Sequence, residues 1–163
     1  MRLKITGHAK HKTMKEPIQI LKWPDQRLRE KCKPCIINDV LREKLAEIEE
    51  FIKTIPPHLG NFIGLAAPQV GITERFFMVM GTWYINPEII WTPKAPLKDF
   101  KEGCYSLQDQ VFAYETQRHY SVSVKYQDPQ GEWHEARLKG LEAQAFQHEF
   151  DHLNGILACD HKK

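Results

Sequence analysis

The sequence has 163 residues, of which 42% are hydrophobic and 27% are charged, and its formal net charge is +2. This length and composition suit one globular domain with a real core and exclude a disordered or fibrous chain. The nearly balanced charge gives no case for direct nucleic-acid reading, and no apolar run approaches the roughly 18–20 residues that span a bilayer.

Residues 1–15, "MRLKITGHAKHKTMK", contain five Lys or Arg and no acidic residue. An organelle-targeting segment is richer in Arg and Ser, and a secretory signal carries an apolar stretch that is missing here. We therefore expect a basic N-terminal tail on a cytoplasmic protein, with organelle targeting as the weaker alternative. A single catalytic domain is expected to follow over residues 16–163.

A helix is predicted to begin at Asn38 or Asp39. Apolar residues then recur at spacings of four and three, at Leu41, Leu45, Ile48, Ile52 and Ile55. This stripe is typical of an amphipathic helix that packs on a core. Pro56 and Pro57 are expected to end the helix, because proline has no backbone N–H to continue the hydrogen-bond ladder.

The middle of the chain changes to strand-like patterns. Residues 75–80 (RFFMVM) and 83–91 (WYINPEIIW) predict strands. Residues 120–138 predict a hairpin, since Val122 and Val124 alternate with polar residues before a turn at "DPQG". Short strands joined by turns and flanked by helices indicate an antiparallel rather than a parallel arrangement.

The last predicted helix runs from Leu141 to Asn154, with Gly155 placed to end it. Apolar residues occupy two of its sides, which is typical of a helix buried at the centre of a domain. We therefore predict an α+β fold, with antiparallel β-sheets packed around this central helix and with the N-terminal helix beside them.

The last helix contains His148 and His152, four residues apart, with Glu149 between them. Residues at i and i+4 project from one face of a helix, so both imidazoles can bind one metal ion. The glutamate points aside, where it can reach a metal-bound water as a general base. A catalytic metal usually has three protein ligands and one open position, so a further ligand is expected elsewhere in the chain.

Four cysteines are candidates for that ligand. Cys104 follows Gly103, which lets the backbone approach a ligand closely, whereas Cys159 lies beyond the end of the helix and is badly aimed. Cys32 and Cys35 form a C-x-x-C pair. The sequence shows neither the second pair of a structural zinc site nor the helix start of a redox motif, so we interpret both as packing residues.

Three stretches, in this order, resemble the motifs of the peptide deformylase family: "FIGLAAPQ" at residues 62–69, "EGCYS" at 102–106 and "QHEFDH" at 147–152. The segment "ILKWPDQRLREKCKPC" is similar to the family's N-terminal stretch, so the resemblance extends over about residues 18–159. It implies a metal-dependent hydrolase that removes the formyl group from the N-terminal formyl-methionine of newly made polypeptides, in weak contact with the ribosome.

By this resemblance, Cys104 joins His148 and His152 as ligands of one divalent ion. One sulfur and two nitrogens suit Fe²⁺, Zn²⁺, Ni²⁺ or Co²⁺. The resemblance implies Fe²⁺ in the cell, with Zn²⁺ or Ni²⁺ in the purified protein.

The resemblance also implies roles for residues around the ion. Glu149 is expected to transfer protons. The side-chain amide of Gln69 and the backbone N–H of Tyr105 are expected to stabilise the formyl oxyanion. Asp151 is expected to form hydrogen bonds that help fix the ligands.

Peptide binding is assigned in the same way. Backbone groups around Gly64 are expected to pair with the extended peptide as an added strand. Ile63, Leu141, Gln144 and Ala145 are expected to form the methionine pocket, in which the polar Gln144 would loosen the preference for methionine.

Three features depart from the family's pattern. Phe62 replaces a glycine of the first motif. The stretch after Ser106 offers no arginine to steer the peptide, and the chain stops eleven residues after His152, without the long C-terminal helix of many bacterial members. Two alternatives therefore stay open: a metal hydrolase with another N-blocked peptide substrate, and a non-catalytic homologue that binds metal and peptide. Glu149 argues against the second, because binding alone needs no general base.

Overall fold

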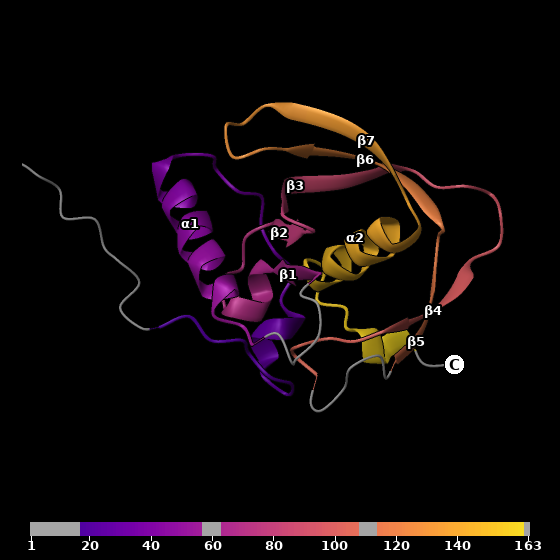
Figure 1. Ribbon diagram of the computed structural model, residues 1–163, viewed down its shortest axis with the longest axis horizontal. Coiled ribbons are helices and arrows are strands. Elements are labelled where there is room, and N and C mark those ends of the chain that lie inside the picture. The colour runs from indigo at the N-terminus through magenta and orange to yellow at the C-terminus, as the bar shows by residue number, and fades with distance from the viewer. Residues whose placement is uncertain (1–16, 57–62, 108–113, 162–163) are drawn as a thin grey trace, which may run out of the picture.

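The computed structural model describes residues 17–56, 63–107 and 114–161. Helix α2 (Gly140–His152) lies between a five-stranded and a two-stranded antiparallel sheet, and helix α1 (Asp39–Lys53) lies at one end of the molecule (Figure 1). The predicted α+β fold with a central helix is confirmed. The basic tail, Pro57, Phe62 and residues 108–113 lie outside the described residues.

The larger sheet has the strand order β1-β2-β3-β6-β7. Its strands are β1 (Gly64–Ala66), β2 (Phe76–Val79), β3 (Thr82–Trp91), β6 (Ser121–Gln127) and β7 (Trp133–Lys139). The predicted hairpin is present as β6 and β7, which pair without interruption. Strand β1 stands at an edge of this sheet and, among the described strands, pairs with β2 alone.

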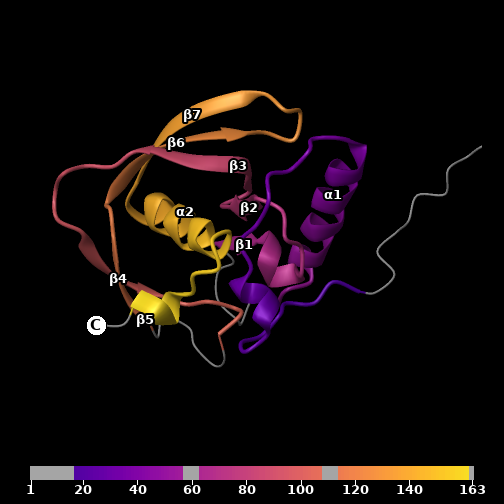
Figure 2. The same cartoon turned by 180° about the vertical axis from the view of Figure 1, so that it is seen from behind.

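The smaller sheet consists of β4 (Lys98–Glu102) and β5 (Tyr114–Arg118). It lies on the opposite side of α2 from β3, β6 and β7 (Figure 1). Three short 3₁₀ turns complete the described fold: η1 (Gln26–Arg29), η3 (Ala67–Val70) and η4 (Ala158–His161). Turn η4 packs beside β5, as the view from behind also shows (Figure 2).

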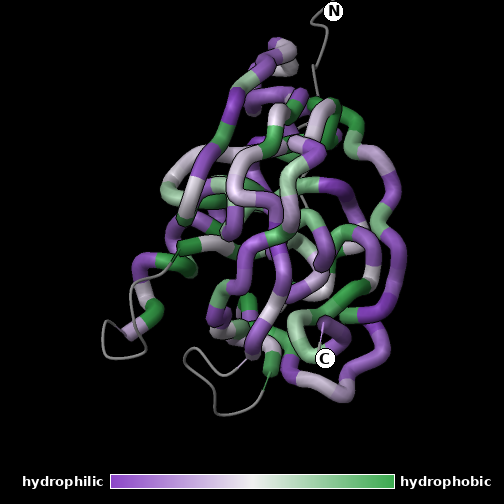
Figure 3. Tube along the Cα trace, turned by 90° about the vertical axis from the view of Figure 1, so that its right-hand side faces the viewer, coloured by the Kyte–Doolittle hydropathy of each residue, from purple (hydrophilic) through white to green (hydrophobic). Residues whose placement is uncertain are grey.

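Strand β2 is buried along its whole length because the two helices cover its two faces. Phe77 and Val79 pack in the core cluster that contains Phe146 of α2, while Phe76 and Met78 pack in the cluster that contains the buried face of α1. This explains why residues 76–79 (FFMV) are apolar throughout instead of alternating. Hydrophobic and hydrophilic residues are interspersed along the trace (Figure 3). None of the described helices combines the length and apolar character needed to cross a membrane.

Helix α1 begins as predicted and ends earlier than predicted. The side chain of Asn38 accepts a hydrogen bond from the N–H of Leu41 at 2.9 Å, so Asn38 is the N-cap. The helix ends at Lys53, before the prolines, because the N–H of Thr54 turns back to the carbonyl of Phe51 at 2.9 Å. The last turn has therefore tightened to the 3₁₀ pattern common at helix ends.

Helix α2 ends at His152, two residues before the predicted Asn154. The N–H of Asn154 bonds to the carbonyl of Asp151 at 2.8 Å, three residues back, so the α-helical ladder has stopped. Gly155 has φ +73°, the left-handed conformation expected of a residue that follows a helix end.

Cys32 and Cys35 are free, buried and divided between two core clusters. Burial raises the pKa of Cys32 to about 11 and that of Cys35 to about 12. Thiols with such pKa values are poor nucleophiles at neutral pH. Their interpretation as packing residues is confirmed.

Gly155 also passes close to another part of the backbone. A Cβ at this position would lie 2.3 Å from the carbonyl oxygen of Arg29. We expect Gly155→Ala to lower the free energy of unfolding by about 3 kcal/mol, because left-handed strain and a clash with rigid backbone act together. Gly81→Ala is the matched control, since Gly81 has φ +82° and nothing lies within 4 Å of an added Cβ. Urea unfolding of both variants, followed by circular dichroism, measures the difference. Equal losses of stability would contradict the prediction.

Candidate metal centre

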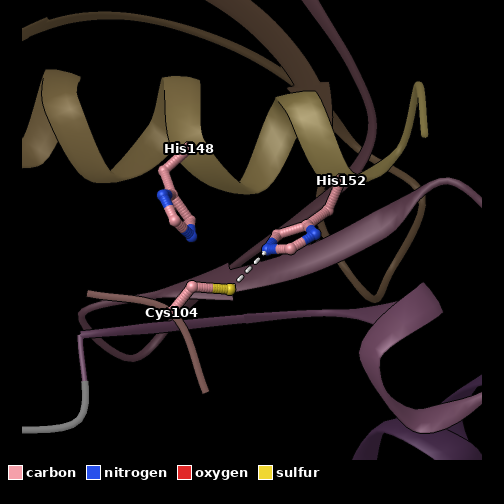
Figure 4. Close-up of side chains that lie close together, drawn as sticks. All are labelled: Cys104, His148 and His152. Atoms are coloured by element: carbon pink, nitrogen blue, oxygen red, sulfur yellow. Dashed lines mark hydrogen bonds between the residues drawn. The ribbon is translucent and has the colours of Figure 1, made fainter. Parts of the chain in front are cut away.

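Cys104, His148 and His152 are brought together at the centre of the molecule. The Cys104 sulfur and one ring nitrogen from each histidine all lie within 4.8 Å of one another, and all three residues are buried. Figure 4 shows both imidazoles projecting from the same face of α2 toward the thiol. Cys104 reaches them from the turn that follows β4. The sequence alone did not show how close Cys104 would lie to the two histidines.

Hydrogen bonds distinguish the two nitrogens of each histidine ring. His148 Nδ1 lies 3.0 Å from Glu102 Oε2, which leaves its Nε2 to face the centre. His152 Nε2 lies 3.4 Å from Cys104 Sγ, while its Nδ1 is buried without a hydrogen-bond partner among the described residues. One nitrogen of each ring is thus directed at the thiol (Figure 4).

The electrostatics of the cluster favour a metal-binding thiolate. Burial by itself raises the pKa of Cys104, but the charge on His152 and hydrogen bonds with His148 and His152 hold that pKa well below its usual range. The thiolate is the form of cysteine that binds metals. A thiolate with two imidazoles suits divalent Fe, Co, Ni or Zn, so the residues present fit such an ion.

Glu149 lies beside the cluster as an incompletely satisfied buried acid. Among the described residues, its Oε2 has no hydrogen-bond partner, and burial raises its pKa to about 7. Such a carboxyl group can accept and release a proton near neutral pH. Its other oxygen occupies the space that a side chain would fill at Gly64, where an added Cβ would lie 2.6 Å from Oε1. The glycine therefore makes room for the acid.

Gln69 lies in η3 with its amide held in one orientation. Its Oε1 accepts from the N–H of Ala66 at 2.9 Å, and its Nε2 donates to Ser106 Oγ at 3.2 Å. Nε2 also lies 3.8 Å from Cys104 Sγ, so the donor end of the amide faces the cluster. Tyr105 directly follows Cys104, which puts its backbone N–H at the same place in the fold.

A buried ion-pair network behind His148 carries residues that the sequence did not single out. Arg118 donates two hydrogen bonds of 2.9 Å to the carboxylate of Glu102, and both residues are 4% exposed. Burial raises the pKa of Glu102, but hydrogen bonds from His148 and Arg118 hold it well below its usual range. Glu102 therefore stays ionised and fixes the ring of His148.

Asp151 belongs to the outer part of the same network. It pairs with Arg118, and its Oδ2 lies 2.8 Å from His161 Nε2. The carboxylate in direct contact with His148 is Glu102, the first residue of "EGCYS". In the sequence, the only sign of a role for Glu102 was its position two residues before Cys104. Arg118 carries no local signal, because it reaches the site from β5.

The residues predicted to form a methionine pocket have different surroundings. Ile63 and Ala145 pack in the core cluster that contains Phe146. Leu141 is half exposed at the start of α2. The side-chain amide of Gln144 donates to the carbonyl of Lys101 at 3.3 Å, which ties α2 to β4.

Comparison with known proteins gives one consistent family. A family profile described as "Polypeptide deformylase" matches residues 17–163. The chain is 43% identical over 141 residues to a peptide deformylase of Thermotoga maritima, covering 83% of this chain and 81% of the relative. It is 37% identical over 158 residues to one of Zymomonas mobilis, with 88% and 85% covered.

Solved structures agree with the sequence comparison. The crystal structure of peptide deformylase from Thermotoga maritima is similar with a TM-score of 0.80 and 37% identity, covering 91% of this chain and 99% of that chain. A peptide deformylase from Synechococcus elongatus in complex with actinonin also has a TM-score of 0.80, with 32% identity and coverage of 93% and 82%.

We expect Glu102→Gln to weaken metal binding by about 10- to 100-fold, the usual effect of losing a carboxylate that orients a metal-binding histidine. Competition with a chromophoric chelator for Zn²⁺ measures the affinity. Glu115→Gln is the control, because Glu115 is exposed on the neighbouring β5. An unchanged affinity in a folded Glu102→Gln protein would show that this carboxylate does not support the site.

Proposed function

The chain belongs to the polypeptide deformylase family, and we propose that it removes the formyl group from the N-terminal formyl-methionine of newly made polypeptides. The family consists of metal-dependent enzymes. The observation that carries the proposal is the buried cluster of Cys104, His148 and His152 with Glu149 beside it. A thiolate, two imidazoles and a buried acid supply a metal site and a proton carrier in one place.

In this proposal, Cys104, His148 and His152 would hold one divalent ion, which when bound would lower the pKa of a water and make hydroxide available near neutral pH. We propose Fe²⁺ as the ion in the cell and Zn²⁺ or Ni²⁺ in purified protein, on the basis of family resemblance. The donor set is compatible with each of them.

Glu149 is proposed to move the proton. It takes the proton from the attacking water and delivers it to the amine of methionine as the bond from the formyl carbon to nitrogen breaks. Two observations support this role: the pKa of Glu149 is raised to about 7, and Oε2 lacks a hydrogen-bond partner among the described residues. The Glu149 carboxyl group can therefore hold and release a proton near neutral pH.

Gln69 and Tyr105 are proposed to stabilise the negative charge on the formyl oxygen. The carbonyl end of the Gln69 side chain is held by Ala66, so the NH₂ group is directed to the cluster without rearrangement. The second donor is the backbone N–H of Tyr105. Donors fixed in advance stabilise a developing charge more effectively than donors that must reorient. A backbone donor also tolerates the tyrosine side chain, where the family has leucine.

The edge position of β1 supports a proposed path for the peptide. Gly64 begins β1, next to Glu149, and an extended peptide can pair with such an edge as an additional strand. We propose Ile63, Leu141, Gln144 and Ala145 as contacts for the methionine side chain. The side-chain amide of Gln144 donates a hydrogen bond to the carbonyl of Lys101.

Free cysteines support a reducing compartment, which we propose to be the cytoplasm. A weak ribosome contact is part of the same proposal, because the substrates are new polypeptides. Substrate recognition through the peptide needs no direct reading of nucleic acid.

A non-catalytic role is disfavoured, because burying a carboxyl group beside the cluster is unfavourable and serves no purpose in binding alone.

Formate release from formyl-Met-Ala-Ser, with anaerobically prepared protein loaded with Fe²⁺ or Ni²⁺, tests the proposed activity. We expect Glu149→Gln to lower kcat by about 10²–10⁴-fold while keeping metal and peptide affinity, because only the proton carrier is lost. Cys104→Ala is expected to lose the metal and turnover together. Glu142→Gln, on the same helix and not in the cluster, is the matched control.

Turnover in the Glu149→Gln variant at the wild-type rate would contradict the assigned role. If folded, metal-loaded wild-type protein releases no formate, the formyl-methionine substrate is wrong. Hydrolysis of acetylated peptides would then favour the alternative of another N-blocked substrate.

A further inference from the structure

Three consecutive residues near the N-terminus run across both loops that carry the proposed oxyanion donors. The N–H of Leu21 donates to the carbonyl of Gln69 at 2.7 Å, and the N–H of Trp23 donates to the carbonyl of Ser106 at 2.7 Å. Between them, the ammonium group of Lys22 donates to the carbonyl of Tyr105. The segment Leu21–Trp23 therefore joins the Gln69 turn to the turn after β4.

The turn after β4 has a peptide group whose orientation needs support. The N–H of Leu107 bonds to the carbonyl of Cys104 at 3.1 Å, so Tyr105 and Ser106 are the central residues of a four-residue turn. The two common turn types differ mainly by rotation of the peptide between the central residues. Here that peptide carries the Tyr105 carbonyl, which is the atom that Lys22 holds.

The same turn connects several parts of the site. Cys104 is its first residue, and the backbone N–H of Tyr105 belongs to the peptide group that directly precedes the central one. Ser106 Oγ accepts from Gln69 Nε2 at 3.2 Å, so the turn also positions the second proposed donor. Rotation of the central peptide would change the backbone angles of Tyr105 and Ser106. Such a change would displace the proposed oxyanion donors, and about 1 Å of misplacement in an active site can lower the reaction rate about 100-fold.

We propose that Lys22 is a positioning residue for the reaction, which fixes the Cys104–Leu107 turn so that the Tyr105 N–H and the Gln69 amide meet the formyl oxygen together. This inference rests on the proposed deformylase function. Lys22 acts through the Tyr105 carbonyl and is not itself an oxyanion donor. Its side chain is exposed, and the backbone bonds of Leu21 and Trp23 hold the segment without it. Loss of the ammonium group therefore leaves the fold and the metal ligands in place.

Steady-state kinetics on formyl-Met-Ala-Ser with the metal-loaded full chain test the inference. Lys22→Met keeps the length of the side chain and removes its charge and donors. We expect its kcat to fall about tenfold, with KM, metal content and melting temperature unchanged, because the donors are displaced from the transition state. Lys22→Arg is expected to restore most of kcat, since it can donate to the same carbonyl. Lys31→Met, at another exposed lysine, controls for loss of charge.

The possible outcomes separate this inference from the proposed function. Normal kcat in Lys22→Met, with active wild-type protein, would overturn the positioning role and leave the deformylase function intact. A raised KM at unchanged kcat would also overturn it, because Lys22 would then act on substrate binding. Loss of metal or a lower melting temperature would show a merely structural role. Absence of turnover in the wild-type protein would overturn the proposed function and this inference together.

Discussion

Burial of the ionisable face of α2 constrains how the surrounding segments are arranged. His148, Glu149 and His152 are each at most 8% exposed, and burial of such groups is unfavourable unless partners compensate for lost water. The compensation is unequal. His148 has the ionised Glu102, which in turn has Arg118, whereas Glu149 Oε2 and His152 Nδ1 have no hydrogen-bond partner among the described residues. The fold thus holds the proposed metal ligand His148 in one orientation and leaves one oxygen of Glu149, the proposed proton carrier, without a hydrogen-bond partner among the described residues.

Several chain segments must be arranged together to meet this constraint. Apolar residues of the larger sheet hold α2 in place, and α1 packs in a separate core cluster. Strand β4 ends at the point where Glu102 and Cys104 can both reach α2. Turn η3 adds Gln69, whose Nε2 lies 3.8 Å from the Cys104 sulfur. Close packing leaves little room for change, because the carboxylate of Glu149 occupies the space beside Gly64. Chemistry and packing are therefore linked through the same residues.

Sequence patterns predicted the elements with strong periodicity. The stripe of α1, the β6–β7 hairpin and the histidine pair of α2 depend on local spacing, which the fold preserves. Element ends were less predictable, because the last hydrogen bonds of each helix depend on local competition between three- and four-residue spacings. Cys104 entered the ligand set through family resemblance. Arg118 and Lys22 had no signal at all, since their contacts with Glu102 and Tyr105 join residues distant in the sequence.

In the proposed metal site, one thiolate and two imidazoles hold the ion. X-ray absorption spectroscopy of the protein loaded with one equivalent of Co²⁺ tests it most directly, because sulfur and nitrogen scatterers are distinguished by their distance from the metal. We expect one sulfur and two imidazole nitrogens around the metal in the wild-type protein, with the sulfur contribution lost in Cys104→Ser. A shell without sulfur, or one whose sulfur persists in Cys104→Ser, would contradict it.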